Sequence, residues 1–381
     1  MVVAASAVVA LGTVTGMMSA LDATERSDEA GPPRVTRSPS LESLPLMPSP
    51  SPSVTKSPSP TPASPTPKTK TARTATPTPA STGTEQKGQQ TAAVSPRLYR
   101  HPESQVLDWV RDNGADPRHA VIQARIAAQP AAVWFADFTP DTITARVRAV
   151  TSGGSARGRV PVVVPYAVPD RDCGGHSQGG APDLDAYDDW IDRFAAGLGT
   201  GDVIVILEPD SIAQSECLSA ARRADRFASL ARAGRAFKAA NPKARVYYDA
   251  GHSGWHAPGE QAQWLKQAGA ASTASSDGIF SNVSNFHTTA DEIAYDRQVL
   301  DSLGGPAGLG AVIDTSRNGT GAPADGEWCD PAGRKLGRAP TLSTGEARID
   351  AYLWVKLPGE SDGCKGRPGT FTASYAYDLA R

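Results

Sequence analysis

One apolar segment of the chain ends on two carboxyl groups. The run DVIVILEPDSI, residues 202–212, is built of Val, Ile and Leu until it reaches Glu208 and Asp210. Such a run predicts a buried strand, and burial at the tip of a strand raises the pKa of a carboxyl group. A carboxyl group that keeps its proton at neutral pH can serve as a general acid.

A second carboxylate close to a buried acid raises its pKa further through like-charge repulsion. Asp172 is our candidate for this neighbour of Asp210, because a disulfide at the adjacent Cys173 would hold it in place. One protonated and one ionised carboxyl group form the pair that hydrolysis of a glycosidic bond requires.

Polar side chains follow nearly every apolar run beyond residue 97. They are Trp134 with Asp137, Tyr166 with Asp172, Glu208 with Asp210, Asp249 with His252, Asn282 with Asn285, Asp314 with Arg317, and Lys356 with Glu360 and Asp362. Asp and Asn favour turns and helix N-caps, which accounts for one or two such positions but not for all of them. We therefore expect these side chains to gather in one cleft.

The elements that must position these side chains alternate between strands and helices. The predicted strands are residues 131–138, 159–167, 202–210, 244–251, 278–286, 308–316 and 350–360. The predicted helices are residues 184–199, 218–241, 258–271 and 289–305. This alternation predicts an α/β fold, a seven-stranded parallel β/α barrel that is incomplete because it lacks one strand of the usual eight. In such barrels the site lies where the carboxyl ends of the strands enter loops.

The motifs argue against several other chemistries. The chain has no phosphate-binding or dinucleotide fingerprint and no G-x-S-x-G elbow. His252 and His256 are spaced as in some metalloproteases, but no Glu follows His252, and Gly254 and Pro258 argue against a helix. The net charge of −2 offers no basic field for nucleic acid. We expect neither a metal nor another cofactor.

Tryptophan is concentrated near the acids. Trp134, Trp255 and Trp328 fall in the same tips and loops, and Trp354 falls on the last predicted strand. Aromatic platforms for sugar rings are the third requirement of glycoside hydrolysis, although packing in the core is the alternative for each Trp. Trp255 lies among Gly, Ser, His and Pro, so we expect it to be an exposed platform.

The N-terminal part differs in composition from the rest. Residues 2–21 form an apolar run about as long as a membrane-spanning helix, and residues 1–30 are predicted to be a signal peptide or a membrane anchor. Residues 31–96 are rich in Pro, Ser and Thr and predict a disordered linker. Residues 97–381 are predicted to form one catalytic domain. We expect a secreted protein, or one tethered through residues 2–21.

All four cysteines lie in the predicted domain, at positions 173, 217, 329 and 364. Four cysteines allow three pairings. We favour the sequential pairs Cys173–Cys217 and Cys329–Cys364, because each would cross-link loops beside the acids. A zinc site is the alternative, and it is disfavoured because the spacings are wide and no CxxC pair exists.

Several motifs together resemble glycoside hydrolase family 6, the cellulases that invert the anomeric centre. They are PYAVPDRDCGGHSQGGA, VILEPDSI, YYDAGHSGW, SNVSNF, IDTSRNG, EWCDPAGRKLG and LWVKLPGESDGC, in that order between about Pro130 and Arg381. The resemblance implies a distorted barrel with fewer than eight strands, two sequential disulfides and a β-1,4-glucan as substrate. We expect the protein to act as a monomer.

The resemblance also implies roles for individual residues. Asp210 matches the general acid. Asp172 matches the carboxylate that raises the pKa of the acid and accepts the proton of the attacking water through a second water. Asp362 matches the candidate for a direct base, and Tyr166 the tyrosine that distorts the sugar at the point of cleavage. Substrate-binding positions are Trp134, Asp249, His252, Trp255, Asn282, Trp328, Lys356 and Glu360.

An open cleft and internal cleavage are predicted, because residues 328–356 leave little room for a loop that could cover the site. The alternatives are an exo-acting cellobiohydrolase of the same family and a carbohydrate-binding surface protein that has lost catalysis. One departure concerns a serine that some members have six residues after the RDC aspartate. Gln178 stands there in this chain, with Ser177 one position earlier.

Two of the polar positions are expected to be structural. Asp314 and Arg317 in DTSRNG are predicted to form an ion pair, and Asp137 is predicted to be a turn residue.

Overall fold

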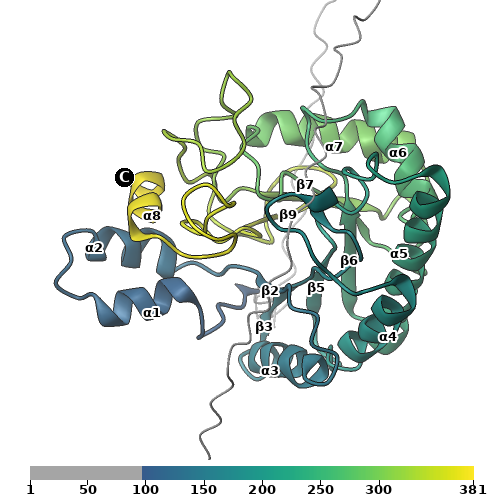
Figure 1. The fold of residues 1–381 in the computed structure, drawn as a ribbon, viewed down its shortest axis with the longest axis horizontal. Coiled ribbons are helices and arrows are strands. Elements are labelled where there is room, and N and C mark those ends of the chain that lie inside the picture. Colours follow the sequence, from purple (N-terminus) through teal and green to yellow (C-terminus); the bar gives the residue numbers. More distant parts are fainter. Residues whose placement is uncertain (1–96) are drawn as a thin grey trace, which may run out of the picture. The chain divides into compact units, whose positions relative to one another are not determined.

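A computed structural model of the chain describes residues 97–381 (Figure 1). The predicted signal or anchor segment, residues 1–30, and the predicted linker, residues 31–96, lie outside the described residues. Within residues 97–381, no helix has both the length and the apolar character that crossing a bilayer requires.

The centre of the described region is a sheet of seven parallel strands (Figure 1). In spatial order they are β2 (Val133–Phe135), β4 (Val162–Pro165), β5 (Val203–Leu207), β6 (Ala244–Asp249), β7 (Gly278–Ser281), β8 (Gly310–Asp314) and β9 (Ile349–Leu353). Each overlaps one predicted strand. The prediction of an incomplete, seven-stranded parallel β/α barrel is therefore confirmed.

The two edge strands of this curled sheet, β2 and β9, approach each other. Ala132, just before β2, donates its backbone N–H to the carbonyl of Trp354 at 2.9 Å. The indole Nε1 of Trp134 in β2 donates to the carbonyl of Val355 at 2.7 Å. Since Trp354 and Val355 directly follow β9, these bonds join the two edges without an eighth strand.

Helices between the strands cover the outer face of the sheet (Figure 1). They are α3 (Ile143–Ser155), α4 (Leu184–Ala195), α5 (Ala220–Ala240), α6 (Pro258–Gln267) and α7 (Thr289–Leu303), with a 3-10 turn at Asp172–Gly174. Three others, α1 (Gln105–Asp112), α2 (His119–Ile122) and α8 (Ala373–Ala380), share a small separate core with a π-helical segment, Gln123–Ala127. The four predicted helices correspond to α4 through α7.

The predicted strand at residues 159–167 is two strands in the structure. β3 (Arg159–Val160) pairs with β1 (Arg97–Leu98) in a separate two-stranded sheet, whereas β4 belongs to the main sheet. Pro161 separates them, because proline has no N–H to donate to a strand ladder.

The strands of the main sheet are buried on both faces, which explains their unbroken apolar sequence. In β5, Val203, Val205 and Leu207 pack between the sheet and the helices, while Ile204 and Ile206 pack inside the barrel. Each side chain is at most 1% exposed, and burying one contributes about 1.5–3 kcal/mol. This strand is therefore a rigid support for the residues that follow it.

Two acids on α7, one helical turn apart, are fully buried. The Oε1 of Glu292 accepts the backbone N–H of Ser253 at 2.9 Å, and the Oδ2 of Asp296 accepts the hydroxyl of Ser281 at 3.1 Å. Their remaining oxygens, Glu292 Oε2 and Asp296 Oδ1, have no hydrogen-bond partner. Burial raises the pKa of both groups, that of Glu292 to about 6. Relative to the unfolded chain, the folded state therefore favours the neutral forms of both acids.

We expect Glu292→Gln to stabilise the fold at neutral pH. Because the pKa of Glu292 is raised only in the folded state, stability is lost as pH rises from the ordinary value of 4.5 to about 6. Gln keeps the acceptor for Ser253 and cannot ionise. In urea unfolding, the free energy of unfolding of the variant should be about 2 kcal/mol higher than that of the parent at pH 7 and equal to it at pH 4. A variant that loses as much stability as the parent over this range would contradict the prediction.

Candidate active site

A cleft of about 1090 Å³ opens where the carboxyl ends of the strands enter loops. Most of the predicted catalytic and substrate-binding residues line it: Trp134, Tyr166, Asp172, Asp210, His252, Trp255, Trp328, Lys356, Glu360 and Asp362. Asp249 and Asn282 do not line it. The topology thus brings together side chains that are up to 228 positions apart in sequence (134 to 362).

The backbone around this cleft contains most of the described non-glycine residues that have left-handed conformations. Among residues 97–381, nine non-glycine residues have positive φ. All but Arg348 lie in the loops around the cleft or next to them: Asp170, Asp172, Cys173, Glu208, Asp210, Asn282, Ser284 and Asp330. Such conformations cost roughly 1–3 kcal/mol each and persist where the surrounding structure holds them, commonly at functional sites. They set the direction in which the acids point.

Asp210 follows β5 and is surrounded by acidic groups. Its pKa is raised well above the ordinary value, first by burial and then by the charges of Asp249, Asp172 and Asp362. The charge of Lys356 acts in the opposite direction but does not reverse the shift. The carboxyl group is thus stripped of most of its hydration while part of the residue opens on the cleft. The raised pKa favours the protonated form of Asp210, which is the form that a general acid requires.

Asp249 lies behind Asp210 rather than in the cleft, which corrects the prediction that it binds substrate. It is 2% exposed. Its Oδ2 accepts the backbone N–H groups of Ile212 and Ala213 at 3.1 and 2.8 Å, and its Oδ1 accepts that of Gly251 at 3.0 Å. Asp249 therefore ties the segment after Asp210 to the end of β6, and its charge acts on Asp210 from beneath the cleft.

Glu208, the other acid at the tip of β5, is also structural. It is fully buried, and its Oε2 accepts the backbone N–H groups of Ala167 and Val168 at 2.9 and 3.0 Å. These bonds fix the chain just after Tyr166 to β5.

Asp172 lies on a loop that is anchored from two sides. The disulfide between Cys173 and Cys217 fixes the residue next to it, as predicted. The Oδ2 of Asp172 accepts the backbone N–H of Ser177 at 2.6 Å. Arg171 holds the same turn, because its Nε donates to the carbonyl of Ser177 at 2.8 Å. Asp172 itself remains half-exposed to the cleft, so water can reach it.

Tyr166 and Trp134 form one aromatic wall of the cleft. Their ring centroids are 5.2 Å apart and the rings stand edge to face at 86°. The guanidinium of Arg171 lies 4.6 Å from the centroid of the Tyr166 ring. Burial, with the charges of Asp210 and Asp172, raises the pKa of Tyr166 far above its ordinary value. The phenol therefore keeps its proton and can donate a hydrogen bond.

Asp362 is held by two cations. The Nη1 of Arg317 donates to its Oδ2 at 2.7 Å, and the Nζ of Lys356 lies 3.2 Å from its Oδ1. The backbone N–H of Asp330 donates to the same Oδ2 at 3.1 Å. Both oxygens of Asp362 are therefore occupied by donors.

The predicted ion pair between Asp314 and Arg317 is wrong, because Arg317 pairs with Asp362 instead. Asp314 accepts the backbone N–H groups of Ser316 and Lys356, each at 2.9 Å. It thus joins the ends of β8 and β9. Asp137 lies in an exposed bend after β2, in agreement with its expected role as a turn residue.

Asn282 is a buried support rather than a residue of the cleft, which corrects its predicted role. Its Nδ2 donates to the carbonyls of His287 and Asp314 at 3.1 and 2.9 Å, and its Oδ1 accepts the N–H of His287 at 3.0 Å. The loop that Asn282 shapes places Ser284 and Asn285 in the cleft instead.

A second aromatic group consists of His252, His287 and Trp255. The two imidazoles stack with centroids 4.3 Å apart, and the indole lies 5.2 Å from His252. Burial and the neighbouring His287 lower the pKa of His252 to about 3, so this ring is neutral. Trp255 is half-buried rather than exposed as predicted, and it lines the cleft.

The remaining tryptophans differ in exposure. Trp328 is 52% exposed and lines the cleft, with its centroid 5.8 Å from that of His176. Trp354 is 3% exposed, and its Nε1 donates to the carbonyl of Arg338 at 3.0 Å. It packs in the small core with α1, α2 and α8 and is not a sugar platform.

Glu360 is the last of the predicted substrate-binding residues that line the cleft. Burial raises its pKa to about 7, and the Nε2 of Gln105 donates to its Oε1 at 3.2 Å.

The second predicted disulfide, Cys329–Cys364, is also formed, so both sequential pairs are confirmed.

The cleft contains residues that sequence analysis did not assign to the site. They are Glu103, Ser104, Gln105, Arg171, His176, Gln214, His287, Glu327 and Arg367. Ser177 and Gln178, noted only as a departure from the family, line it as well. Arg171 and His176 could have been inferred from their place beside Asp172. Gln105 and Arg367 carry no motif, because only the folded chain brings their segments together.

Comparison with known proteins points to one family. The profile of the glycosyl hydrolases family 6 matches residues 88–377. Endoglucanase 1 of Streptomyces sp. (strain KSM-9) is 52% identical over 300 residues, covering 78% of this chain and 82% of that protein. Endoglucanase A of Thermobispora bispora is 47% identical over 300 residues, covering 78% of this chain and 65% of that protein.

A solved structure agrees with this result. The Mycobacterium tuberculosis endoglucanase in complex with methyl-cellobiosyl-4-deoxy-4-thio-β-D-cellobioside is 38% identical, with a TM-score of 0.69, and the match covers 75% of this chain and 97% of that one. The profile, the sequence identities and the shared fold lead to the same assignment. The chain belongs to the glycosyl hydrolases family 6.

Proposed function

We propose that this glycoside hydrolase cleaves internal β-1,4-glucosidic bonds of cellulose or a related β-glucan and inverts the anomeric carbon. Asp210 is the general acid. Asp172 assists it and accepts the proton of the attacking water through a second water. The names of the Streptomyces and Thermobispora relatives, both endoglucanases, support the internal cleavage and the substrate class.

The observation that carries the proposal is the environment of Asp210. Burial and three neighbouring carboxylates raise its pKa, while the residue opens on the cleft. A glycosidic oxygen leaves poorly unless it receives a proton as its bond to carbon breaks. A carboxyl group that is protonated at neutral pH supplies this proton.

The contacts of the other acids favour Asp172 as the group that receives the proton of the attacking water. One oxygen of Asp172 accepts the backbone N–H of Ser177, and the residue is partly exposed in the cleft. Both oxygens of Asp362 contact donors, which belong to Arg317, Lys356 and the backbone of Asp330. We therefore assign Asp362 the role of a fixed negative charge near Asp210 and not that of a direct base.

The lining of the cleft suits a neutral chain of sugar rings. Tyr166 with Trp134, the His252–Trp255 group and Trp328 present aromatic faces along it, against which the C–H faces of glucose can pack. Lys356 and Glu360 add polar groups that can bind hydroxyls.

Two disulfides are typical of proteins that fold in an oxidising compartment, so we propose that the enzyme acts outside the cell. The signal or anchor segment, the linker and the monomeric state stay predictions from the sequence.

The stereochemistry of the product tests the proposed mechanism. Proton NMR should show that the new reducing ends released from a soluble cello-oligosaccharide appear first as the α-anomer and only later equilibrate. An inverting enzyme acting on a β-linkage must give this result, since water attacks the face opposite the leaving group. Initial formation of the β-anomer would refute both inversion and the roles assigned to Asp210 and Asp172.

A further inference from the structure

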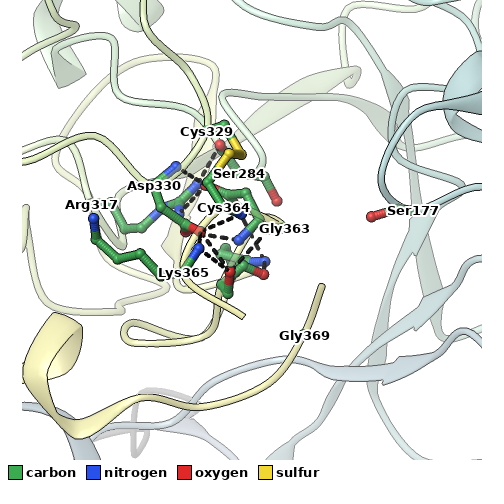
Figure 2. Close-up of polar contacts among 12 residues, drawn as sticks. Ser177, Ser284, Arg317, Cys329, Asp330, Gly363, Cys364, Lys365 and Gly369 are labelled. Atoms are coloured by element: carbon green, nitrogen blue, oxygen red, sulfur yellow. Dashed lines mark hydrogen bonds and ion pairs between the residues drawn. A yellow bond between two sulfur atoms is a disulfide. The ribbon is translucent and has the colours of Figure 1, made fainter. Parts of the chain in front are cut away.

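Asp330 is a buried carboxylate that the reaction described above does not use. It lies in the segment between β8 and β9 and is 1% exposed. Its oxygens face the turn formed by Gly363, Cys364 and Lys365 (Figure 2). Oδ1 accepts the backbone N–H of Asp362 at 2.8 Å. Oδ2 accepts the hydroxyl of Ser361 at 2.5 Å and the backbone N–H groups of Cys364 and Lys365 at 3.0 and 2.8 Å.

These donors keep Asp330 ionised although it is buried. Burial by itself raises the pKa of a carboxyl group, but the hydrogen bonds from Ser361 and from the backbone of Asp362, Lys365 and Cys364 outweigh it and lower the pKa of Asp330. Successive N–H groups that converge in this way form a concave site for an anion. In this protein the anion is a side chain of the same chain, so the carboxylate acts as a template for the turn.

Asp330 and Asp362 also bind each other in both directions. The N–H of Asp362 donates to the Oδ1 of Asp330, and the N–H of Asp330 donates to the Oδ2 of Asp362 at 3.1 Å. The first bond fixes the backbone of Asp362 and the second fixes its side chain. With its backbone and side chain both held, the carboxylate of Asp362 meets Arg317 at 2.7 Å and Lys356 at 3.2 Å.

The neighbouring disulfide performs a different task. Cys329 and Cys364 join the same two segments, with their Cα atoms 5.8 Å apart. One covalent link limits the distance between the segments but leaves the peptide groups free to turn about it. The carboxylate of Asp330 fixes their orientation through four hydrogen bonds.

We propose that Asp330 is a positioning residue for the reaction, which orients Asp362 so that its charge is paired with Arg317 and Lys356 and stands near Asp210. The proposal rests on the proposed function through the role given to Asp362. It assigns to Asp330 no contact with the substrate.

A double-mutant cycle tests the proposal. kcat/KM on a soluble cello-oligosaccharide is measured for the parent, Asp330→Asn, Asp362→Asn and the double variant. Asn keeps the shape of Asp330 but removes its charge and turns an amide group toward N–H donors. Asp330→Asn should lower kcat/KM roughly 10²-fold in the parent, since a misplacement of about 1 Å in an active site costs this much. In the Asp362→Asn background the further loss should be less than about threefold, because the two residues act as a unit.

Equal losses in the two backgrounds would overturn the proposal, since Asp330 would then act independently of Asp362. Full activity of Asp362→Asn alone would instead refute the role of Asp362 in the proposed function, and the role of Asp330 with it. The two failures are therefore distinguishable.

Two further variants keep the experiment interpretable. Asp325→Asn removes an exposed carboxylate from the same segment and should leave kcat/KM unchanged. Ser361→Ala is milder than Asp330→Asn because it removes one of the four bonds to the carboxylate and no charge. It should lower kcat/KM about 3- to 10-fold, as expected for the loss of one hydrogen bond, and only while Asp362 is present. An equal loss without Asp362 would contradict the proposal.

Discussion

An Asp210→Ala variant should hydrolyse an unactivated cello-oligosaccharide roughly 10³- to 10⁴-fold more slowly than the parent, with the loss in kcat. Ala leaves no group to protonate the glycosidic oxygen, so the sugar would have to depart as an alkoxide. Two neighbouring acids cannot replace it, because Asp249 lies behind the cleft and both oxygens of Asp362 contact donors.

The leaving group supplies the control for this prediction. A dinitrophenyl cello-oligosaccharide departs as a stable phenolate and needs no proton, so Asp210→Ala should lose far less activity on it than on the unactivated substrate. Asp202→Ala is the matched variant, since Asp202 is exposed at the opposite end of the same strand. It should retain the activity of the parent. Equal losses on both substrates for Asp210→Ala would contradict the role of a general acid.

An Asp172→Asn variant should show the second largest effect, a fall in kcat of about 10²-fold, together with a changed pH profile. Its charge is one of those that raise the pKa of Asp210. Without that charge the ionised form of Asp210 becomes less unfavourable and its pKa falls. The alkaline limb of kcat/KM, where Asp210 loses its proton, should therefore move to lower pH.

Asp170→Asn is the matched control for Asp172→Asn. Asp170 is exposed two residues earlier and pairs with Arg222 at the surface, so both the rate and the alkaline limb should stay as in the parent. Should Asp172→Asn lose rate while its alkaline limb does not move, Asp172 would not be one of the charges that hold the proton on Asp210. A variant with unchanged rate would remove Asp172 from the mechanism.

The main sheet could be predicted from the sequence because its strands are buried on both faces. A strand such as β5 then reads as an unbroken run of Val, Ile and Leu, which surface elements do not show. β1 could not be predicted, because its two residues carry no pattern and it exists only by pairing with β3. The last strand ends earlier than predicted, at Leu353, because the next backbone groups leave the ladder with β8. The carbonyl of Trp354 accepts the N–H of Ala132, and the N–H of Lys356 donates to the side chain of Asp314.

The acids of the site could be placed at one end of the barrel from the sequence, but their individual partners could not. Asp249 is the last residue of β6 and Asp210 follows β5, yet only Asp210 faces the cleft. The direction of a side chain at a strand tip depends on local backbone angles, such as the φ of 69° at Asp210. Arg317 is three residues from Asp314 and still pairs with Asp362, because its long side chain reaches a loop that is distant in sequence. Asp330 lies in the motif EWCDPAGRKLG, but the sequence does not show that its carboxylate faces the turn of Asp362.

The protonation state of Asp210 in the native enzyme is the most direct test of the account. Carbon-13 NMR of protein labelled at the Asp carboxyl carbons, with the signal of Asp210 assigned by its loss in Asp210→Asn, would follow this group across the pH range. We predict that the carboxyl group stays neutral well above the ordinary pKa of Asp and ionises in step with the alkaline loss of kcat/KM. An ionised Asp210 at about pH 5 with undiminished turnover would contradict the account.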